Sequence, residues 1–369
     1  MRAIGIILAG GNNDRLGQLT SSRATSAMPI ASCYRTIDFP LSNMTNSGVT
    51  KVAVITQFNS RSLHDHLTSS KWWDFGRKQG GLFVFTPFLS NDNSFWFRGT
   101  ADSIYQNISF LKRSKEPYVI IASGDCVYKM DYNKLLDHHI AKEADITIAC
   151  KTLTGEDVRQ YGVMDLNSEG RVIDFEEKPV EPTSSTISLG IYVISRTLLI
   201  KMLEAISAEG RYDFVKDIII RYRKKIKIHA WEYNGYWKSI NSTKSYFDTN
   251  MDFLKADVRY KFIKEYPYIA TKPKDQSPVK YNHTAVTVDS LVGSGSILNG
   301  YVEHSVLFRR VVTGENSRIT NCILLEGVFI GKNCVIENAI FDKEVILPDN
   351  KTIIGEPGKP IMITKNDAL

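Results

Sequence analysis

Short apolar runs alternate with amphipathic segments over roughly the first 255 residues of the chain. The amphipathic stretches include residues 103–112 and 132–141. This alternation predicts an α/β domain with a mainly parallel sheet, in which ligands bind beyond the carboxyl ends of the strands. The predicted strands are residues 4–9, 52–56, 118–122, 146–150, 172–176 and 191–194.

The pattern changes after about residue 257, and the new pattern has a fixed step. FRRVVTGEN begins at Phe308, LEGVFIGKN at Leu325, and DKEVILPDN at Asp342, so each copy follows the last by 17 residues. Apolar residues recur about every six positions and are followed by Gly-x-Asn turns, which predicts a left-handed parallel β-helix of hexapeptide repeats. An antiparallel sandwich is the alternative, but it would not need a constant step.

These two patterns divide the chain into an α/β domain over residues 1–256, a linker over 257–283 and a β-helix over 284–369. The linker assignment rests on three prolines and several lysines within residues 266–282. We expect outward aliphatic residues of the β-helix to be covered by the α/β domain or by a partner, because exposed sheet surfaces associate readily. These residues are Ile297, Val306, Ile323 and Ile340.

Composition narrows the class of protein. With 369 residues, 43% hydrophobic and 23% charged, the chain is typical of a globular protein of two or three domains. A net charge of +6, spread along the chain, argues against nucleic acid. No apolar run approaches the ~20 residues that span a bilayer, and the apolar start leads into a glycine turn rather than a signal-peptide cleavage site. Five scattered cysteines without CxxC pairs favour reduced thiols in a cytoplasm over disulfides or zinc.

Three local motifs suggest phosphate and metal chemistry, and each has a plainer explanation. Gly10 and Gly11 follow the first strand and could hold phosphate on their amides, although a tight turn would look the same. Asp125 follows the strand at 118–122, as a Mg²⁺ ligand or as a helix N-cap. Lys178 in EEKP could bind a sugar phosphate, or form a surface ion pair. GTAD (99–102) opens a helix and could receive a nucleotide or sugar on its amides. GYWK (235–238) puts two aromatic residues at a strand end, where they could equally belong to the core.

The order of the motifs is more specific than any one of them. It resembles that of the ADP-glucose pyrophosphorylases (glucose-1-phosphate adenylyltransferases), and the likeness extends to YVEHSVLFR (301–309) in the β-helix. The resemblance implies a Rossmann-like nucleotidyltransferase domain that joins ATP and glucose 1-phosphate into ADP-glucose and pyrophosphate. The motifs are LAGG…RL (8–16), IDFPLSN (37–43), NSG (46–48), TQF (56–58), RGTADSIYQN (98–107), SGDCVYKMDY (123–132), DFEEKP (174–179), SLGIYV (188–193), YDFVKDII (212–219) and GYWK (235–238).

The same resemblance assigns site residues. It makes Arg15 and Asp125 catalytic, with Asp125 as the metal ligand. The implied substrate-binding residues are Leu8, Ala9, Gly10, Gly11, Gln57, Gly99, Thr100, Glu177, Lys178, Ser188 and Gly190.

The chain departs from the family pattern at three positions. Asn13 replaces the third glycine of GGxGxRL, Thr25 replaces the lysine of a Lys-Pro step, and Ser239 replaces the second metal carboxylate of WKD. Phosphoryl transfer depends on positioning and on neutralising phosphate charge, so a lost lysine and a lost carboxylate both weaken it. We therefore expect a weakened Mg²⁺ site and little turnover.

These departures are similar to those of the GlgD-type, non-catalytic subunit of Gram-positive bacteria. That likeness implies a cytoplasmic regulatory subunit of glycogen biosynthesis, which is a homodimer alone and forms a heterotetramer with a GlgC-type catalytic subunit. Glucose 1-phosphate or another sugar phosphate is the implied effector. Family effector sites lie between the domains; Arg23 and Arg35 are near that position, but Ser32 and Cys33 replace its usual glycine and lysine.

Two other functions fit parts of the sequence. An active nucleotidyltransferase could recruit Arg15 or Arg23 to the phosphates and Asp217 to the site. An acyltransferase is the third hypothesis, since hexapeptide β-helices often have that activity, and His304 would then be the candidate base.

Overall fold

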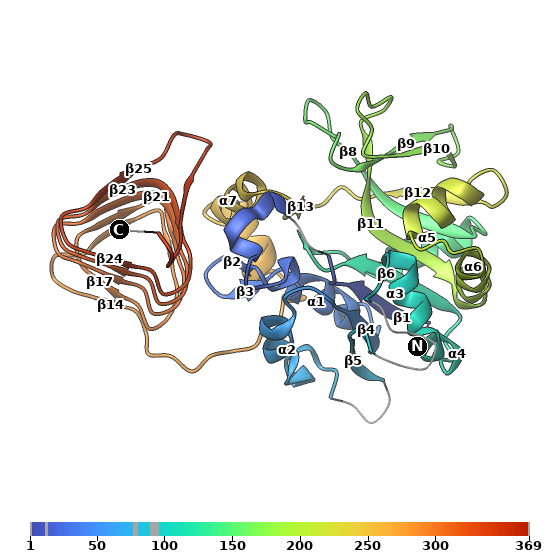
Figure 1. Cartoon of the computed structure of the whole chain (residues 1–369), viewed down its shortest axis with the longest axis horizontal. Helices are drawn as coiled ribbons and strands as arrows, with labels where there is room; N and C mark the ends of the chain where they lie inside the picture. Colours follow the sequence, from blue (N-terminus) through green and yellow to red (C-terminus); the bar gives the residue numbers. More distant parts are fainter. Residues whose placement is uncertain (1, 12–13, 77–79, 89–95, 368–369) are drawn as a thin grey trace.

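The structure is a computed structural model that describes residues 2–11, 14–76, 80–88 and 96–367. Asn13, one of the three predicted departures, lies outside the described residues. An α/β domain and a separate three-sided β-helix lie side by side, joined by an extended connection (Figure 1).

A nine-stranded mixed sheet forms the centre of the α/β domain. Strands β6, β1 and β4 are parallel neighbours, as the alternating pattern predicted. Strand β5, which runs parallel to β4, was not among the predicted strands. Strand β11 runs antiparallel to β6, and it joins this half to β8, β9, β10 and β12. The strands are β1 (Ala3–Leu8), β4 (Lys51–Ile55), β5 (Gly81–Phe85), β6 (Tyr118–Ser123), β8 (Ile146–Thr152), β9 (Gly162–Leu166), β10 (Val172–Glu177), β11 (Thr186–Ser195) and β12 (Ile228–Glu232).

Helices cover the sheet and begin at residues suited to capping. Asp131 and Ser195 accept backbone hydrogen bonds at the starts of α5 and α6, and Ser242 forms a capping box with Ser245 at the start of α7. The helix predicted over 103–112 is interrupted at Asn107, whose side chain bonds the carbonyl of Ser103. The α-helices are α1 (Asp38–Asn46), α2 (Arg61–Leu67), α3 (Thr100–Gln106), α4 (Ile108–Lys112), α5 (Tyr132–Ala141), α6 (Arg196–Ala208), α7 (Thr243–Asp252) and α8 (Ala256–Arg259).

Short elements complete the α/β domain around the carboxyl ends of the parallel strands. The short helices are η1 (Asp14–Thr20), η2 (Thr25–Ala27), η3 (Ser70–Trp73), η4 (Val215–Ile220) and η5 (Tyr260–Lys264). The short strands are β2 (Pro29–Ile30), β3 (Tyr34–Arg35), β7 (Cys126–Tyr128) and β13 (Trp237–Ser239). The predicted linker therefore contains most of α8, all of η5 and strand β14, and residues 265–279 form the extended connection.

The 17-residue step becomes a stack of coils with parallel strands on three sides, consistent with a left-handed β-helix. At the turns, Asn316, Asn333 and Asn350 adopt positive φ, and their side-chain amides bond from coil to coil at 3.3 and 3.0 Å. The strands are β14 (Lys280–Tyr281), β15 (Val286–Val288), β16 (Leu291–Val292), β17 (Ile297–Leu298), β18 (Tyr301–Glu303), β19 (Val306–Leu307), β20 (Val312–Thr313), β21 (Arg318–Leu324), β22 (Phe329–Ile330), β23 (Val335–Phe341), β24 (Ile346–Leu347), β25 (Thr352–Ile354) and β26 (Ile361–Ile363).

One face of the β-helix packs against the α/β domain. Val306, Ile323 and Ile340 are fully buried there, in a cluster that includes Phe39 and Tyr246. We expected four outward aliphatic residues of the β-helix to be covered by the α/β domain or by a partner. The α/β domain covers these three. Ile297, the fourth, keeps 38% of its surface exposed.

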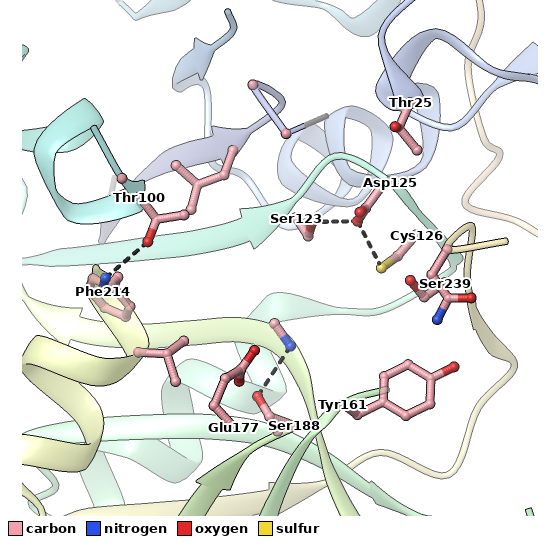
Figure 2. Close-up of a pocket in the computed structure, with 18 of the residues that line it drawn as sticks. Thr25, Thr100, Ser123, Asp125, Cys126, Tyr161, Glu177, Ser188, Phe214 and Ser239 are labelled. Atoms are coloured by element: carbon pink, nitrogen blue, oxygen red, sulfur yellow. Dashed lines mark hydrogen bonds between the residues drawn. The ribbon is translucent and has the colours of Figure 1, made fainter. Parts of the chain in front are cut away.

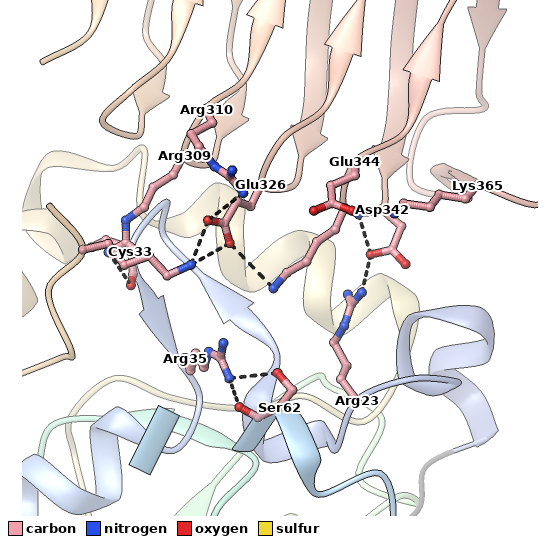
Figure 3. A network of polar contacts seen from close by, with 12 residues as sticks. Arg23, Cys33, Arg35, Ser62, Arg309, Arg310, Glu326, Asp342, Glu344 and Lys365 are labelled. Atoms are coloured by element: carbon pink, nitrogen blue, oxygen red, sulfur yellow. Dashed lines mark hydrogen bonds and ion pairs between the residues drawn. The ribbon is translucent and has the colours of Figure 1, made fainter. Parts of the chain in front are cut away.

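Charged side chains surround this apolar contact (Figure 3). Arg23 and Asp342 form an ion pair of 2.7 Å across the domains, with both side chains largely buried. Glu326 accepts from Lys274 at 2.7 Å and lies 3.8 Å from Lys343. Burial raises the pKa of Glu326, but Lys274, Lys343 and Arg310 together lower it, so the net pKa is below its ordinary value. Burial lowers the pKa of Lys343 to about 8.

Two further expectations concern the chain as a whole. All five cysteines are unpaired, in agreement with reduced thiols. Within the ranges that the structure describes, every helix is too short or too polar to cross a membrane.

Candidate active site

A cavity of about 670 Å³ opens at the carboxyl ends of the parallel strands of the α/β domain. It brings together residues that are as many as 233 positions apart, from Leu8 to Asn241. Ala9 is the one assigned site residue that does not line it; its amide bonds the carbonyl of Ile55. The assigned residues that line the cavity are Leu8, Gly10, Gly11, Arg15, Thr25, Gln57, Gly99, Thr100, Asp125, Glu177, Lys178, Ser188, Gly190 and Ser239.

The glycine turn after β1 forms one wall of the cavity. A Cβ at Gly10 would lie 3.3 Å from the backbone of Gln57, so a larger residue would crowd that neighbour, whereas Gly11 faces open space. The Gln57 side chain is held in turn, because it accepts a 2.7 Å hydrogen bond from the amide of Phe97. The turn thus leaves room for a ligand to approach the backbone closely.

Asp125 lies between β6 and β7, with its carboxylate already engaged (Figure 2). Ser123 donates to Oδ1 of Asp125, and the thiol of Cys126 lies 3.4 Å from the same oxygen. Burial holds the pKa of Cys126 well above its ordinary value, so this thiol stays neutral. Strand β13 pairs with β7 so that Ser239 lies opposite Cys126, next to Asp125. A carboxylate at position 239 would therefore line the same end of the cavity as Asp125.

Thr25 opens the short helix η2 beside this end of the cavity (Figure 2). Its side chain is 5% exposed, and its hydroxyl oxygen has no hydrogen-bond partner in the described part of the chain. A short neutral side chain at this point brings no charge to the cavity.

Glu177, Lys178, Ser188 and Gly190 form the opposite end of the cavity, on β10, β11 and the turn after β10. Burial raises the pKa of Glu177, and the neighbouring Lys178 lowers it in part. Ser188 accepts a hydrogen bond from the amide of Gly190 at 3.3 Å. Carboxylate, hydroxyl and ammonium groups at one end of a half-buried cavity are suited to the hydroxyls and phosphate of a sugar phosphate.

The backbone amides at the start of α3 were predicted to receive a ligand, but two of them form hydrogen bonds within the protein. The carbonyl of Tyr212 accepts from the amides of Ala101 and Asp102 at 2.8 and 3.1 Å, so both donors are occupied. A Cβ at Gly99 would lie 2.4 Å from that oxygen, which explains the glycine. Thr100 is also engaged, since its hydroxyl accepts from the amide of Phe214 at 2.9 Å.

Several lining residues were not singled out from the sequence. Tyr161 and Gln160 come from the turn before β9, and Asn241 follows β13. Gln160 meets Arg15 at 3.3 Å, and burial raises the pKa of Tyr161. These three residues share no motif or spacing that a sequence could reveal. Their positions next to strands that carry recognised motifs were the one available signal.

The fit to Mg²⁺ is poor at this site. Mg²⁺ needs oxygen ligands in near-octahedral geometry and usually takes one or two carboxylates with phosphates and water. Asp125 accepts from two neutral donors, and Ser239 supplies no charge. In the ranges described, no three His, Cys, Asp or Glu side chains are grouped to hold a metal.

Of the residues named for the other hypotheses, Arg15 lines the cavity, and the others lie elsewhere. Arg23 is paired with Asp342 between the domains, and Asp217 accepts from the amides of Tyr212 and Asp213 outside the cavity lining. His304 is a surface turn residue of the β-helix, 2.9 Å from Asp289. A second cavity of about 40 Å³ lies between the domains. Its lining includes the positions considered for an effector, namely Ser32, Cys33 and Arg35.

The fold and the cavity define a nucleotidyltransferase-type protein with a hexapeptide domain, and two family models agree. The model of the nucleotidyl transferases matches residues 4–256. The model of the GlmU-like C-terminal hexapeptide matches residues 276–359.

Individual relatives narrow the class further. The chain is 37% identical to a glucose-1-phosphate adenylyltransferase of Bacillus cytotoxicus over 356 residues, which cover 96% of this chain and 95% of the relative. The proteins of the same name from Bacillus mycoides and Bacillus anthracis are 37% and 36% identical over 355 residues, or 95% of this chain and 94% of each relative. The chain therefore belongs to the nucleotidyl transferase family, among relatives named glucose-1-phosphate adenylyltransferases.

Proposed function

We propose that this chain is a regulatory subunit of glucose-1-phosphate adenylyltransferase, with little or no turnover of its own, in the cytoplasmic synthesis of ADP-glucose for glycogen. The observation that carries the proposal is the difference between the two ends of the cavity. The end with Glu177, Lys178 and Ser188 offers groups for a sugar phosphate. The end with Thr25, Asp125 and Ser239 has one carboxylate, already hydrogen-bonded, and two neutral residues.

The reaction named for the relatives explains why this difference affects turnover. An oxygen of glucose 1-phosphate attacks the α-phosphorus of ATP, and pyrophosphate leaves. Charge develops on phosphate oxygens, and removing one preorganised group that stabilises such charge typically costs roughly 10²–10³ in rate. With two neutral residues at that end, the site would still bind a sugar phosphate, as substrate or as effector. It would catalyse the transfer only slowly.

A regulatory role requires a catalytic partner. We propose a heterotetramer with a catalytic paralogue, in which this chain raises the partner's activity. The pocket of this chain would then respond to sugar phosphate, while the partner performs the transfer.

The direct test is to assay the purified chain, a purified catalytic paralogue and their mixture for pyrophosphate release from ATP and glucose 1-phosphate. We expect almost no release by this chain alone and a mixture more active than the paralogue. Turnover by the chain alone at the rate of its catalytic relatives would instead establish the second function, an active nucleotidyltransferase. Arg15 in the cavity lining is the observation in favour of that alternative.

A further inference from the structure

Six half-buried polar side chains line the end of the cavity that holds Asp125. They come from three separate parts of the chain, namely the end of β6 with the residues after it, the turn before β9, and β13 with the residues after it. Asp125 is the one carboxylate of the set, and the others are hydroxyl or amide groups. We call this set the Asp125 end. Its members are Ser123, Asp125, Gln160, Tyr161, Ser239 and Asn241.

Part of the hydrogen-bonding capacity of the Asp125 end is used within the protein. Oδ1 of Asp125 accepts from Ser123 and Cys126. Oε1 of Gln160 accepts from Arg15 at 3.3 Å. Oδ2 of Asp125 and the side-chain nitrogen of Gln160 form no hydrogen bond with the residues that the structure describes. Because both side chains are half-buried and line the cavity, a ligand can supply the missing partners.

Tyr161 adds an aromatic ring and a hydroxyl to the same end (Figure 2). Its ring meets the indole of Trp237 edge to face, with 5.6 Å between the ring centres. Burial raises the pKa of the Tyr161 hydroxyl, and a hydrogen bond with the Asn241 side chain lowers it in part, so the hydroxyl stays protonated. An aromatic surface beside neutral donors and acceptors suits a ligand that has both C–H and O–H groups.

The charges at the Asp125 end disfavour a polyphosphate. Asp125 and Arg15 have opposite signs, so their formal charges cancel, and the rest of the set is neutral. Arg98, a further cation of the cavity lining, is engaged by Asp102 at 3.0 Å. A triphosphate carries several negative charges and needs cations around it, whereas sugar hydroxyls pair well with neutral groups and with a single carboxylate.

The Asp125 end is continuous with the end of the cavity that carries Glu177. Gly162 follows Tyr161 in the chain, and a Cβ at Gly162 would lie 3.1 Å from Oε2 of Glu177. One cavity of about 670 Å³ contains both ends. Pockets of roughly 300–1,000 Å³ enclose most of a drug-sized ligand, so there is room for two sugar units.

We propose that the Asp125 end binds an uncharged sugar unit, so that a short α-linked glucan such as maltose occupies both ends of the cavity. In this arrangement Oδ2 of Asp125 accepts from a ring hydroxyl, and the amide of Gln160 and the hydroxyl of Tyr161 bond further hydroxyls. The Tyr161 ring packs against a C–H face of the sugar. The inference rests on the proposed function, since the sugar end and the α-linkage are both taken from the role in glycogen synthesis.

Calorimetric titration of the purified full-length chain with maltose tests the inference. We expect maltose to bind and glucose 1-phosphate to displace it, because both need the Glu177 end. Tyr161→Phe keeps the ring and removes the hydroxyl, so it should weaken maltose binding by roughly 2- to 10-fold, the range typical of one neutral hydrogen bond. Asn241→Ala should have a similar effect. Both variants should bind glucose 1-phosphate like the wild type.

The matched control is Asn234→Ala, at an exposed asparagine outside the cavity lining, and it should leave both affinities unchanged. Equal melting temperatures of the variants show that the fold is kept. Absence of maltose binding by the wild type would overturn the inference, as would equal losses of maltose and glucose 1-phosphate on Asn241→Ala. Cellobiose, which is β-linked, should bind more weakly than maltose, and equal affinity would overturn the α-linked assignment.

Adenosine is the comparison ligand for a nucleotide at this end. If adenosine binds and the two variants weaken its binding instead of that of maltose, the Asp125 end takes a nucleoside and the inference is wrong. The titration needs neither ATP nor the catalytic paralogue, so its failure is distinct from that of the proposed function. Turnover at the rate of the catalytic relatives contradicts the proposed function, whereas a chain that binds no maltose contradicts this inference.

Discussion

The two ends of the cavity are built on the same sheet, yet they differ in how freely their polar groups can meet a ligand. At the sugar end, Glu177 and Lys178 are 3.6 Å apart, and their side chains are 25% and 62% exposed. At the other end, one oxygen of the Asp125 carboxylate, Oδ1, accepts from Ser123 and Cys126, and Thr25 and Ser239 bring no charge. The comparison teaches that one cavity can combine an end with exposed charged groups and an end where a single carboxylate stands between two neutral side chains.

The largest effect should come from making the two ends alike in charge. The double variant Thr25→Lys with Ser239→Asp should raise pyrophosphate release at least roughly 10²-fold, because each preorganised charge typically contributes 10²–10³ in rate. The measurement is steady-state turnover with ATP, glucose 1-phosphate and Mg²⁺.

The matched control for that pair is Thr25→Met with Ser239→Asn, which adds similar bulk without charge and should leave turnover at the starting level. If the folded Lys/Asp variant gains nothing over this control, the assignment of positions 25 and 239 to the reacting phosphates is wrong.

A smaller effect is expected on the affinity for glucose 1-phosphate, which should depend on one end of the cavity and not on the other. Glu177→Gln should weaken glucose 1-phosphate binding about 10- to 100-fold, since hydrogen bonds to charged groups contribute about 1.5–3 kcal/mol. Calorimetric titration of the purified chain measures this directly. Ser239→Ala, at the opposite end, should bind the sugar phosphate like the wild type, and equal losses in both variants would contradict the division of the cavity.

A still smaller effect concerns the carboxylate of Asp125. Ser123→Ala removes one hydrogen bond to it, worth about 1 kcal/mol, and should strengthen Mg²⁺ binding by about 5-fold in the Ser239→Asp background. Metal titration followed by calorimetry would show it. An unchanged affinity would mean that the hydrogen bond does not compete with the metal.

The smallest effect is on stability against pH at the sugar end. Because burial raises the pKa of Glu177 in the folded chain, the folded state holds that proton more tightly than the unfolded state. Its stabilising contribution is therefore full below the ordinary carboxyl pKa of 4.5 and is lost as pH rises through the raised value. Melting temperatures of wild type and Glu177→Gln should diverge in favour of the variant over that interval, and parallel curves would argue against the shift.

The β-helix was the more predictable half of the molecule, for a physical reason. Its strands repeat at a constant step, and inward and outward residues alternate locally, so Leu298 and Ile330 could be placed without knowing any distant contact. In the α/β domain the parallel strands β1, β4 and β6 were equally clear as apolar runs, but β5 and β12 were not predicted. The antiparallel insertion of β11 between β6 and β8 was not, because strand direction depends on how the chain returns to the sheet.

The candidate site shows the same division. Motifs that follow strands were brought together as expected, since the carboxyl ends of neighbouring strands share one edge. Tyr161 and Asn241 come from irregular segments without a motif, and the closed start of α3 depends on the carbonyl of Tyr212, 111 residues away from Ala101.

The sequence by itself determined the two architectures, the 17-residue coil and the neutral side chains at Thr25 and Ser239, because periodicity and residue chemistry are local properties. Only the tertiary structure decided that Ser123 and Cys126 engage the carboxylate of Asp125, since that depends on how β6 and β7 turn. It alone also decided that Ile323 is covered by the α/β domain while Phe329, an outward residue of another face, keeps 43% of its surface exposed. Both are outward apolar residues of the repeat, and the packing of the α/β domain against one face makes them different.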